Sequence, residues 1–320
     1  NELGWNGNQQ LRTLMARAKV EVAVANAFVT DGWNVLPGVP TSGTASADVF
    51  FGDAAANSFN GADGADLVDG QDGNDSLQGG NGNDTLFGGS GNDVLRGDAG
   101  NDTLYGDEGN DTLSAWAGTN IMDGGDGDDV ITGTADYYNW SANTLLGGAG
   151  NDTLSVEVNY TNANVFDGGA GTDSMSGSRY ADTYRFNLGG GLDTLSEPAN
   201  TVAGYNDKLV FGAGIAPADI TVVRSGNALL FKHANGTDQV TVTNWFASSN
   251  YWLETVEFAD GTVWTSAALT SAALVFSGTA GNDTITGTVM NDTLLGLGGN
   301  DTISAWAGTN IMDGGDGDDV

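Results

Sequence analysis

The stretch that decides the fold spans residues 70–114 and reads GQDGNDSLQ (70–78), GGNGNDTLF (79–87), GGSGNDVLR (88–96), GDAGNDTLY (97–105) and GDEGNDTLS (106–114). Each block of nine has glycine at positions one and four, aspartate at position six and leucine at position eight. The glycines let the backbone turn sharply. The three residues after the aspartate run extended, with only the middle side chain facing inward. The repeat therefore predicts a coil of turns and short strands.

The same spacing, Asp or Asn two positions before a large apolar residue, extends with three short slips from Asp48 to Asp193. One such coil cannot bury its apolar side alone, so neighbouring coils must stack. The residues predicted to face inward and form one narrow core are Phe50, Phe59, Val68, Leu77, Leu86, Leu95, Leu104, Leu113, Met122, Ile131, Leu145, Leu154, Phe166, Met175, Tyr184 and Leu195.

The tandem nonapeptide resembles the GGxGxDxUx signature of the RTX (repeats-in-toxin) family of secreted calcium-binding proteins. The resemblance implies an all-β fold of parallel β-rolls, the calcium-bound right-handed β-helix in which two nonapeptides make one coil. Stacked aspartates would repel one another without a cation, and oxygen ligands suit a hard ion such as Ca²⁺. Multiple calcium ions are the expected cofactor. The predicted metal ligands are Asp66, Asp75, Asp84, Asp93, Asp102, Asp111, Asp129, Asp152, Asp173, Asp193, Asp283, Asp292, Asp301 and Asp319.

On a coil of two repeats, the sixth positions form two columns, one along each edge of the stack. The first column reads Asn57, Asp75, Asp93, Asp111, Asp129, Asp152, Asp173, Asp193. The second column reads Asp48, Asp66, Asp84, Asp102, Asn120, Asn143, Asn164, Asp182. Neutral asparagines can form a ladder of side-chain hydrogen bonds without a cation. We therefore expect calcium along the first column and none at the three consecutive asparagine turns.

Those three turns have also lost their glycines, and aromatic residues gather in and near them. The candidate interface residues are Trp116, Tyr138, Trp140, Tyr160 and Trp306. Two interpretations stay open. Another part of the chain covers these aromatics, or they form an exposed patch for another copy of the chain or a surface glycan.

The chain divides into four segments of different composition. Residues 1–42 form an N-terminal cap or contact segment, 43–196 the first β-roll, 197–276 a small β-rich domain and 277–320 a second, incomplete β-roll. In the first segment, apolar spacing over 9–27 predicts an amphipathic helix that covers the first coil or contacts another subunit. The run over 20–24 reads equally well as a strand.

Two further observations concern the C-terminal half of the chain. The elements NWF (244–246) and FADG (258–261) resemble the haemolysin-type calcium-binding-related domain, for which we expect a spacer or cap role. Residues 300–320 repeat residues 110–130 with one conservative change. We therefore expect a long parent protein of tandem units.

Composition narrows the possible partners. The chain has 320 residues, no cysteine, nine Lys plus Arg and a net charge of −33, so nucleic acid is not an expected partner. Without cations, self-repulsion and 51 glycines should leave the array disordered, which makes metal binding the source of folding free energy. Extracellular calcium modules bind at about 10⁻⁴ to 10⁻³ M, so the chain should fold outside the cell. No signal peptide or membrane-spanning run is visible.

The sequence predicts no enzymatic activity. It has one histidine, His233, no thiol, no nucleophile elbow and no zinc spacing. The leading hypothesis is a secreted calcium-binding structural module of a large extracellular protein, such as an adhesin, a surface-layer component or a filament subunit exported by type I secretion. The alternative is the folding and secretion region of an RTX exoenzyme whose catalytic domain lies outside this chain.

Overall fold

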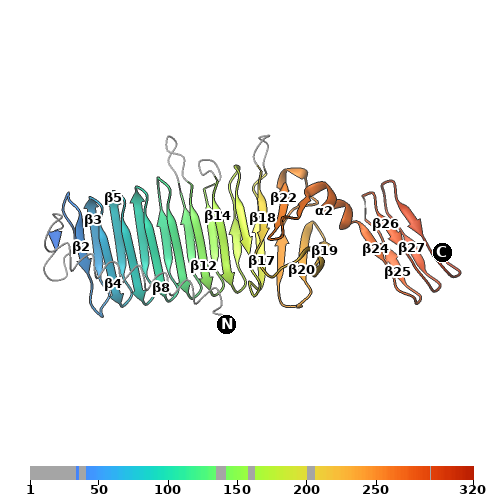
Figure 1. Cartoon of the computed structure of the whole chain (residues 1–320), viewed down its shortest axis with the longest axis horizontal. Helices are drawn as coiled ribbons and strands as arrows, with labels where there is room; N and C mark the ends of the chain where they lie inside the picture. The colour runs from blue at the N-terminus through green and yellow to red at the C-terminus, as the bar shows by residue number, and fades with distance from the viewer. Residues whose placement is uncertain (1–33, 36–40, 135–141, 158–162, 200–205, 289) are drawn as a thin grey trace.

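The computed structural model describes residues 34–35, 41–134, 142–157, 163–199, 206–288 and 290–320. The protein is an elongated stack of coils whose parallel strands alternate between two sheets (Figure 1). Within the described part, the helices are α2 (Ser266–Ala272) and the 3-10 turns η1 (Pro217–Asp219) and η2 (Ser249–Tyr251). The predicted all-β, β-roll class is therefore confirmed. The helix predicted over 9–27 lies outside the described residues.

In the described part of the chain, the first sheet, called sheet 1, has twelve strands. In spatial order they are β1 (Asn34–Val35), β2 (Asp48–Phe51), β4 (Leu67–Asp72), β6 (Thr85–Ser90), β8 (Thr103–Glu108), β10 (Ile121–Asp126), β12 (Thr144–Ala149), β14 (Val165–Ala170), β16 (Thr183–Phe186), β18 (Lys208–Phe211), β22 (Thr255–Phe258) and β23 (Val263–Thr265). From β2 to β22, consecutive strands of sheet 1 pair in parallel with one another. For example, Leu86 of β6 lies opposite Leu104 of β8.

The second sheet, called sheet 2, has eleven strands among the described residues. In spatial order they are β3 (Ser58–Asp63), β5 (Ser76–Asn81), β7 (Val94–Ala99), β9 (Thr112–Ala115), β11 (Val130–Gly133), β13 (Thr153–Val156), β15 (Ser174–Ser176), β17 (Leu192–Ser196), β21 (Gln239–Val242), β20 (Ala228–His233) and β19 (Ile220–Ser225). One strand of each sheet makes one coil, as the resemblance implied.

The predicted core is confirmed. Every residue predicted to face inward is buried, and none is more than 2% exposed. They form one continuous apolar cluster along the stack. Aromatic residues stack in register within it, with ring centroids 4.3 Å apart for Phe50 and Phe59 and 5.0 Å apart for Phe166 and Tyr184. Full burial of such a side chain contributes about 1.5–3 kcal/mol.

The two sheets continue past residue 197. Strands β18 and β22 extend sheet 1 in parallel, and β21 extends sheet 2. The antiparallel pairs β19–β20, β20–β21 and β22–β23 then end both sheets. Neither sheet is interrupted at the predicted boundary between residues 196 and 197. The division into four domains stays a prediction.

The elements NWF and FADG lie in this end structure. Trp245 is fully buried, donates from Nε1 to Thr270 Oγ1 at 2.9 Å, and stacks on Trp252. Phe258 packs in the core, and Gly261, with φ of +88°, makes the turn between β22 and β23. These contacts pack the end structure against the core of the stack, and its role as a spacer or cap stays a prediction.

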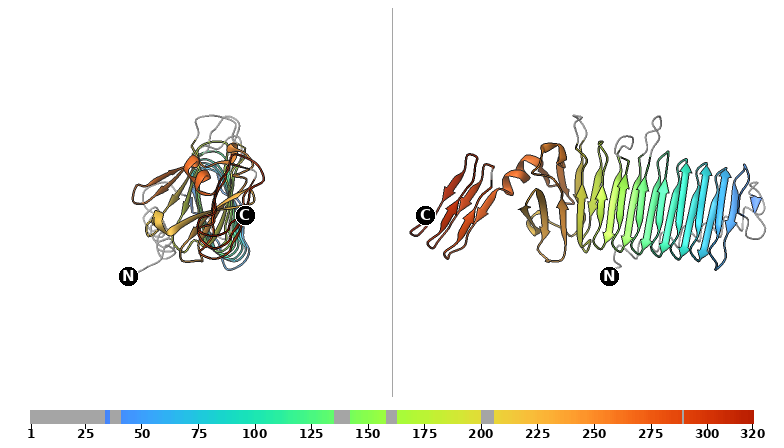
Figure 2. Two further views of the ribbon diagram at one scale, coloured as in Figure 1. Left: turned by 90° about the vertical axis from the view of Figure 1, so that its right-hand side faces the viewer. Right: turned by 180° about the vertical axis from the view of Figure 1, so that it is seen from behind.

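The second array follows α2. Strands β24 (Val275–Ser277), β26 (Thr293–Leu295) and β28 (Ile311–Asp313) form one parallel sheet, and β25 (Thr284–Thr286) and β27 (Thr302–Ser304) form another. Figure 2 shows these strands beyond α2, at the end of the molecule that carries the C-terminus. Leu269 of α2 packs into the core of the long stack, so the helix joins the two arrays.

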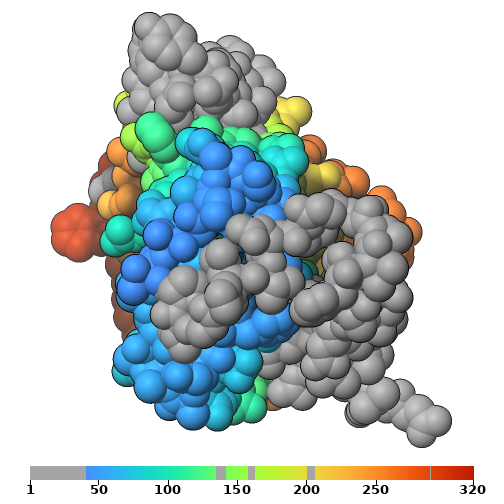
Figure 3. All heavy atoms as spheres, turned by 90° about the vertical axis from the view of Figure 1, so that its left-hand side faces the viewer, coloured from blue at the N-terminus to red at the C-terminus, as the bar shows by residue number. Residues whose placement is uncertain are grey.

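A second, smaller apolar cluster lies on the outer face of sheet 1, in the first coils. It contains Val49, Leu67 and Phe87, with Phe51 and Tyr105 packed against it. These side chains point away from the core because they flank inward residues on the strands. Figure 3 shows this end of the stack, with the first coils in blue.

Candidate metal centre

The aspartates of the two columns lie at the start of strands, where the chain turns from one sheet to the other. From Asp66 onward, one carboxylate oxygen, Oδ1, accepts the backbone N–H of the equivalent residue one coil earlier. Asp66 N donates to Asp84 Oδ1 at 2.8 Å in the second column, and Asp75 N donates to Asp93 Oδ1 at 2.7 Å in the first. The stacking of coils thus fixes the orientation of every carboxylate.

The other carboxylate oxygen, Oδ2, points into the turn, and in most of these aspartates it makes no hydrogen bond. It is buried without a hydrogen-bond partner in Asp66, Asp75, Asp84, Asp93, Asp102, Asp111, Asp129, Asp152, Asp173, Asp193 and Asp301. Buried polar atoms are normally hydrogen-bonded, and an unpaired buried charge is costly. A regular row of such oxygens therefore indicates a ligand that is not a hydrogen-bond donor.

The first glycine of each turn leaves space beside this oxygen. A Cβ atom on Gly124 would lie 2.1 Å from Asp129 Oδ2 and 2.6 Å from the carbonyl oxygen of Gly147 in the next coil. A Cβ on Gly70 would lie 2.1 Å from Asp75 Oδ2 and 2.6 Å from Gly88 O. Carboxylate and carbonyl oxygens of adjacent coils thus converge at a place that a side chain would fill, and calcium takes oxygen ligands of both kinds. The residues fit a hard cation such as calcium.

The second residue of the turn decides whether Oδ2 stays unpartnered. We call a turn open where Oδ2 has no hydrogen-bond partner. There the second residue has a positive φ, as Gln71 (74°), Asp98 (62°) and Asp107 (75°) do before Asp75, Asp102 and Asp111. Glycine takes this conformation without cost, and asparagine and aspartate tolerate it better than most residues.

We call a turn capped where Ser or Thr is the second residue. The backbone N–H of that residue then donates to Oδ2, as Thr279 does to Asp283 at 2.6 Å and Thr288 to Asp292. The hydroxyls of both threonines donate to the same carboxylates. Asp48 and Asp182 are capped in the same way by Thr44 and Ser178.

The predicted ligands therefore fall into two groups. All predicted ligands of the long stack lie in open turns. In the second array, Asp301 lies in an open turn, and Asp319 Oδ2 lies 2.2 Å from the Cβ position of Gly314. Asp283 and Asp292 lie in capped turns. The sequence signal for this difference is Thr in place of Gly at position two, which the nonapeptide spacing alone does not reveal.

Burial raises the pKa of the open-turn carboxyls above their ordinary value of 3.8. The pKa reaches about 6 for Asp66, about 7 for Asp111 and about 8 for Asp129. Loss of hydration is the main cause, and carboxylates of neighbouring coils add to it, while the N–H that each carboxylate accepts acts in the opposite direction. A divalent cation would oppose both effects that raise the pKa, because it stabilises the charged form.

The three asparagine turns have a different bonding pattern. Asn120 Nδ2 donates to Asn143 Oδ1 at 3.0 Å, and Asn164 Nδ2 donates to Asp182 Oδ1 at 2.7 Å. The side-chain bonds do not form a continuous ladder, because Asn143 Nδ2 has no hydrogen-bond partner among the described residues and the bond from Asn164 ends on a carboxylate. That calcium is absent from these turns stays a prediction.

The aromatic candidates are only partly described. Trp116 is half-exposed and Trp306 is 78% exposed. Tyr138, Trp140 and Tyr160 lie outside the described residues. Their role as an interface stays a prediction.

Sequence reasoning missed two members of the second column. Asp182 N donates to Asp207 Oδ1 at 2.8 Å, and Asp207 N donates to Glu254 Oε2 at 2.7 Å, so the column runs on beyond the nonapeptides. The sequence does contain a signal for these two residues. Both acidic residues stand two positions before an inward apolar residue, Leu209 and Val256, as in the repeats.

We compared the chain with known proteins. The extracellular lipase LipA from Serratia marcescens, a solved structure, is 24% identical with a TM-score of 0.26 and covers 53% of this chain. This chain spans 37% of the lipase chain. No curated protein matches the sequence. None of the described helices has the length and apolar character needed to cross a bilayer.

Two families match parts of the chain. The haemolysin-type calcium binding protein related domain matches residues 229–268. The RTX calcium-binding nonapeptide repeat matches residues 42–77, 69–104, 78–113, 96–131, 117–136, 137–156, 161–184, 275–288 and 286–320. The nonapeptide matches together cover more than half of the 320 residues. The chain belongs to the family of proteins that carry RTX calcium-binding nonapeptide repeats.

Proposed function

We propose that this chain is a calcium-dependent structural module of a secreted protein, and that it folds when calcium binds the open turns. The observation that carries the proposal is the row of buried Asp Oδ2 atoms without partners, several of which, such as those of Asp75 and Asp129, lie close to a carbonyl oxygen of the next coil. Without a cation, these turns would bury like charges close together. With a cation between them, the same oxygens hold successive coils together.

The energetic scale supports folding outside the cell. A site with a dissociation constant of about 10⁻⁴ to 10⁻³ M contributes about 1.4–2.7 kcal/mol when calcium exceeds that constant by about 10- to 100-fold. Folded domains are stable by only about 5–15 kcal/mol in total, so several such sites are enough to decide folding. Where calcium is scarce, this contribution disappears and self-repulsion of a chain with net charge −33 remains.

The parent protein in this proposal is a large extracellular assembly of tandem units, such as an adhesin, a surface-layer component or a filament subunit. The near-identity of residues 110–130 and 300–320 supports repeated units. Both copies also present an exposed tryptophan at the same position, Trp116 and Trp306. A repeated exposed aromatic suits contact with another copy of the chain or with a surface glycan.

Circular dichroism during a calcium titration tests the folding proposal. After treatment with chelator, the chain should show little β structure, and it should gain this structure cooperatively as calcium is added. A spectrum that does not respond to calcium contradicts the proposal. Electron microscopy and sedimentation of the calcium-loaded chain then test assembly, with Trp116→Ala combined with Trp306→Ala as the variant. Unchanged self-association in that variant rules out the tryptophans as the contact.

A further inference from the structure

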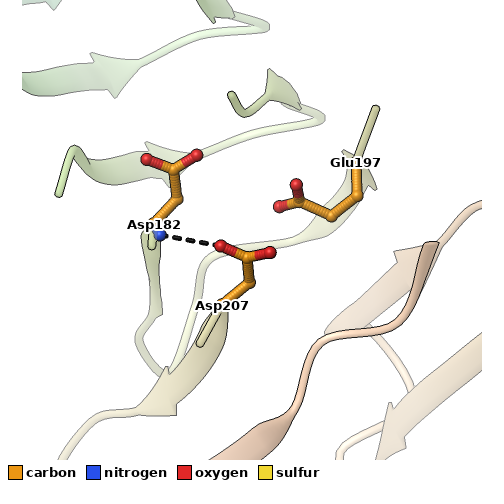
Figure 4. Close-up of side chains that lie close together, drawn as sticks. All are labelled: Asp182, Glu197 and Asp207. Carbon is orange, nitrogen blue, oxygen red and sulfur yellow. Dashed lines mark hydrogen bonds between the residues drawn. The ribbon is translucent and has the colours of Figure 1, made fainter. Parts of the chain in front are cut away.

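Three buried carboxylates converge where the nonapeptide array meets the cap (Figure 4). Asp182 precedes β16, Asp207 precedes β18, and Glu197 directly follows β17 of the opposite sheet. Their exposed fractions are 1%, 1% and 3%. One oxygen of each lies within 4.8 Å of the oxygens of the other two. The cluster therefore joins both sheets at the end of the second column.

Glu197 occupies a position of sheet 2 that is glycine in most coils and Ala115 or Val156 in two of them. Ser176 of β15 is opposite Ser196 of β17, so Glu197 stands opposite Gly177, the first residue of the turn before Asp182. At the open turns this glycine leaves space beside Asp Oδ2. A Cβ on Gly177 would lie closest to the hydroxyl oxygen of Tyr184, and 2.8 Å from Asp182 Oδ2 and 2.9 Å from Glu197 Oε1. At this turn the carboxylate of Glu197 and the hydroxyl of Tyr184 therefore both lie near Asp182 Oδ2.

The bonding of the cluster leaves one oxygen without a partner. Glu197 Oε1 accepts the hydroxyl of Tyr184, whereas the buried Oε2 has no hydrogen-bond partner. Asp207 Oδ1 accepts the N–H of Asp182 at 2.8 Å. Asp182 Oδ2 accepts the N–H and the hydroxyl of Ser178 at 2.6 and 3.0 Å. That hydroxyl can rotate away, which frees a lone pair of Asp182.

The charges around the cluster are also uncompensated. Burial raises the pKa of Glu197 well above its ordinary range, and that of Asp207 to about 8, with neighbouring carboxylates adding to both shifts. Among the described residues, none of the main causes of the pKa shifts of Glu197, Asp207 and Asp182 is a cationic side chain. Lys208, the next residue after Asp207, pairs instead with Glu257.

We propose that Glu197, Asp207 and Asp182 bind one hard divalent cation at the end of the second column. The donor set contains only oxygen, and its three carboxylates supply the negative charge that calcium sites use. The site differs from those of the array because its ligand with the free oxygen, Glu197, comes from outside the nonapeptide motif. A bound cation would tie β16, β17 and β18 together and fasten the cap to the array.

An anomalous difference map tests this site in the wild-type chain. Crystals of the full 320-residue chain, grown with calcium and soaked with terbium, should show a peak between Glu197 and Asp207 as well as peaks in the open turns. Peaks in the open turns without one at Glu197 overturn this inference and leave the proposed function standing. Absence of peaks at both places contradicts the proposed function itself.

A calcium count on variants gives the second measurement. Glu197→Gln keeps the shape of the side chain and removes its charge, so it should release one calcium per chain. Glu108→Gln is the matched control, because it removes the same charge from an exposed side chain and should release none. If Glu197→Gln keeps the full count with an unchanged circular dichroism spectrum, Glu197 instead retains a proton, and the cation site is refuted.

Discussion

The adjacent residues Asp128 and Asp129 allow the open-turn mechanism to be tested with an internal control. Asp129 is buried, and its Oδ2 faces the carbonyl of Gly147. Asp128 is exposed and accepts the N–H of Asn151 at 2.7 Å. Asp129→Asn and Asp128→Asn remove the same charge one residue apart. In both variants an amide oxygen remains to accept the existing backbone hydrogen bond, so only Asp129→Asn should remove a calcium ligand.

The expected loss follows from the site. Asn in place of Asp129 keeps the acceptor for Asp111 N and replaces Oδ2 with an amide that cannot bind calcium. If one site is lost, the free energy of unfolding at about 10 mM calcium should fall by about 1.4–2.7 kcal/mol. The effect should shrink as calcium is lowered, since it depends on the ratio of calcium concentration to the dissociation constant. Asp128→Asn should change the free energy of unfolding by less than about 0.5 kcal/mol.

The assay is urea unfolding followed by circular dichroism at a series of calcium concentrations. The slope of the unfolding free energy against the logarithm of calcium concentration reports how many ions are released on unfolding. For Asp129→Asn this slope should fall by about one ion, and for Asp128→Asn it should match the wild type. Equal slopes for all three proteins would refute the assignment of Asp129 as a ligand.

Three further predictions concern protons, the glycine space and the outer apolar cluster. Burial raises the pKa of the open-turn carboxyls from 3.8 to about 6 for Asp66, about 8 for Asp129 and about 9 for Asp193, so the metal-free fold binds protons that the unfolded chain releases. The stability of the metal-free fold should be greatest below about pH 4 and be lost as the pH rises through about 6–9. Chelated protein should therefore show more β structure at about pH 5 than at about pH 8, and equal spectra would contradict the pKa shifts. Gly124→Ala should destabilise the calcium-loaded chain by at least about 1–3 kcal/mol, because the new Cβ would clash with Asp129 Oδ2. Gly281→Ala is the control, because its Cβ would have its nearest contact at 3.7 Å and should cost little stability. Similar urea midpoints for the two variants would contradict the clash at Gly124. If residues 1–33 cover the cluster around Phe87, their deletion should increase binding of an apolar dye to the calcium-loaded chain, and unchanged dye fluorescence would rule out this cover.

Much of the fold can be predicted from the sequence because each turn and strand depends on residues within a single repeat. Glycines at fixed positions make the turns, and the alternation of a strand places the eighth residue of each repeat inside. Residues such as Leu86, Met122 and Tyr184 were therefore predicted to be buried, and all are. The two columns follow from the same counting, because equivalent residues of successive coils must lie side by side once the coils stack.

The chemistry of individual turns needed the tertiary structure. The same aspartate at position six has an unpartnered oxygen in Asp301 and a hydrogen-bonded one in Asp292, because Thr288 donates into the second turn. This difference depends on the φ of a neighbouring residue and on the carbonyl of the next coil. The nine-residue spacing of the aspartates predicts neither this φ angle nor the position of that carbonyl.

The sequence by itself determined the class of fold, the core and the general use of calcium, since each depends on residues within one or two repeats. Only the tertiary structure decided which carboxylates from outside the repeats lie close together. Glu197 and Asp207 belong to no nonapeptide, and they meet Asp182 because β17 and β18 stack on the last coils of the array. Contacts of that kind are set by the register of stacked strands, which the packing of the whole core imposes and no local pattern records.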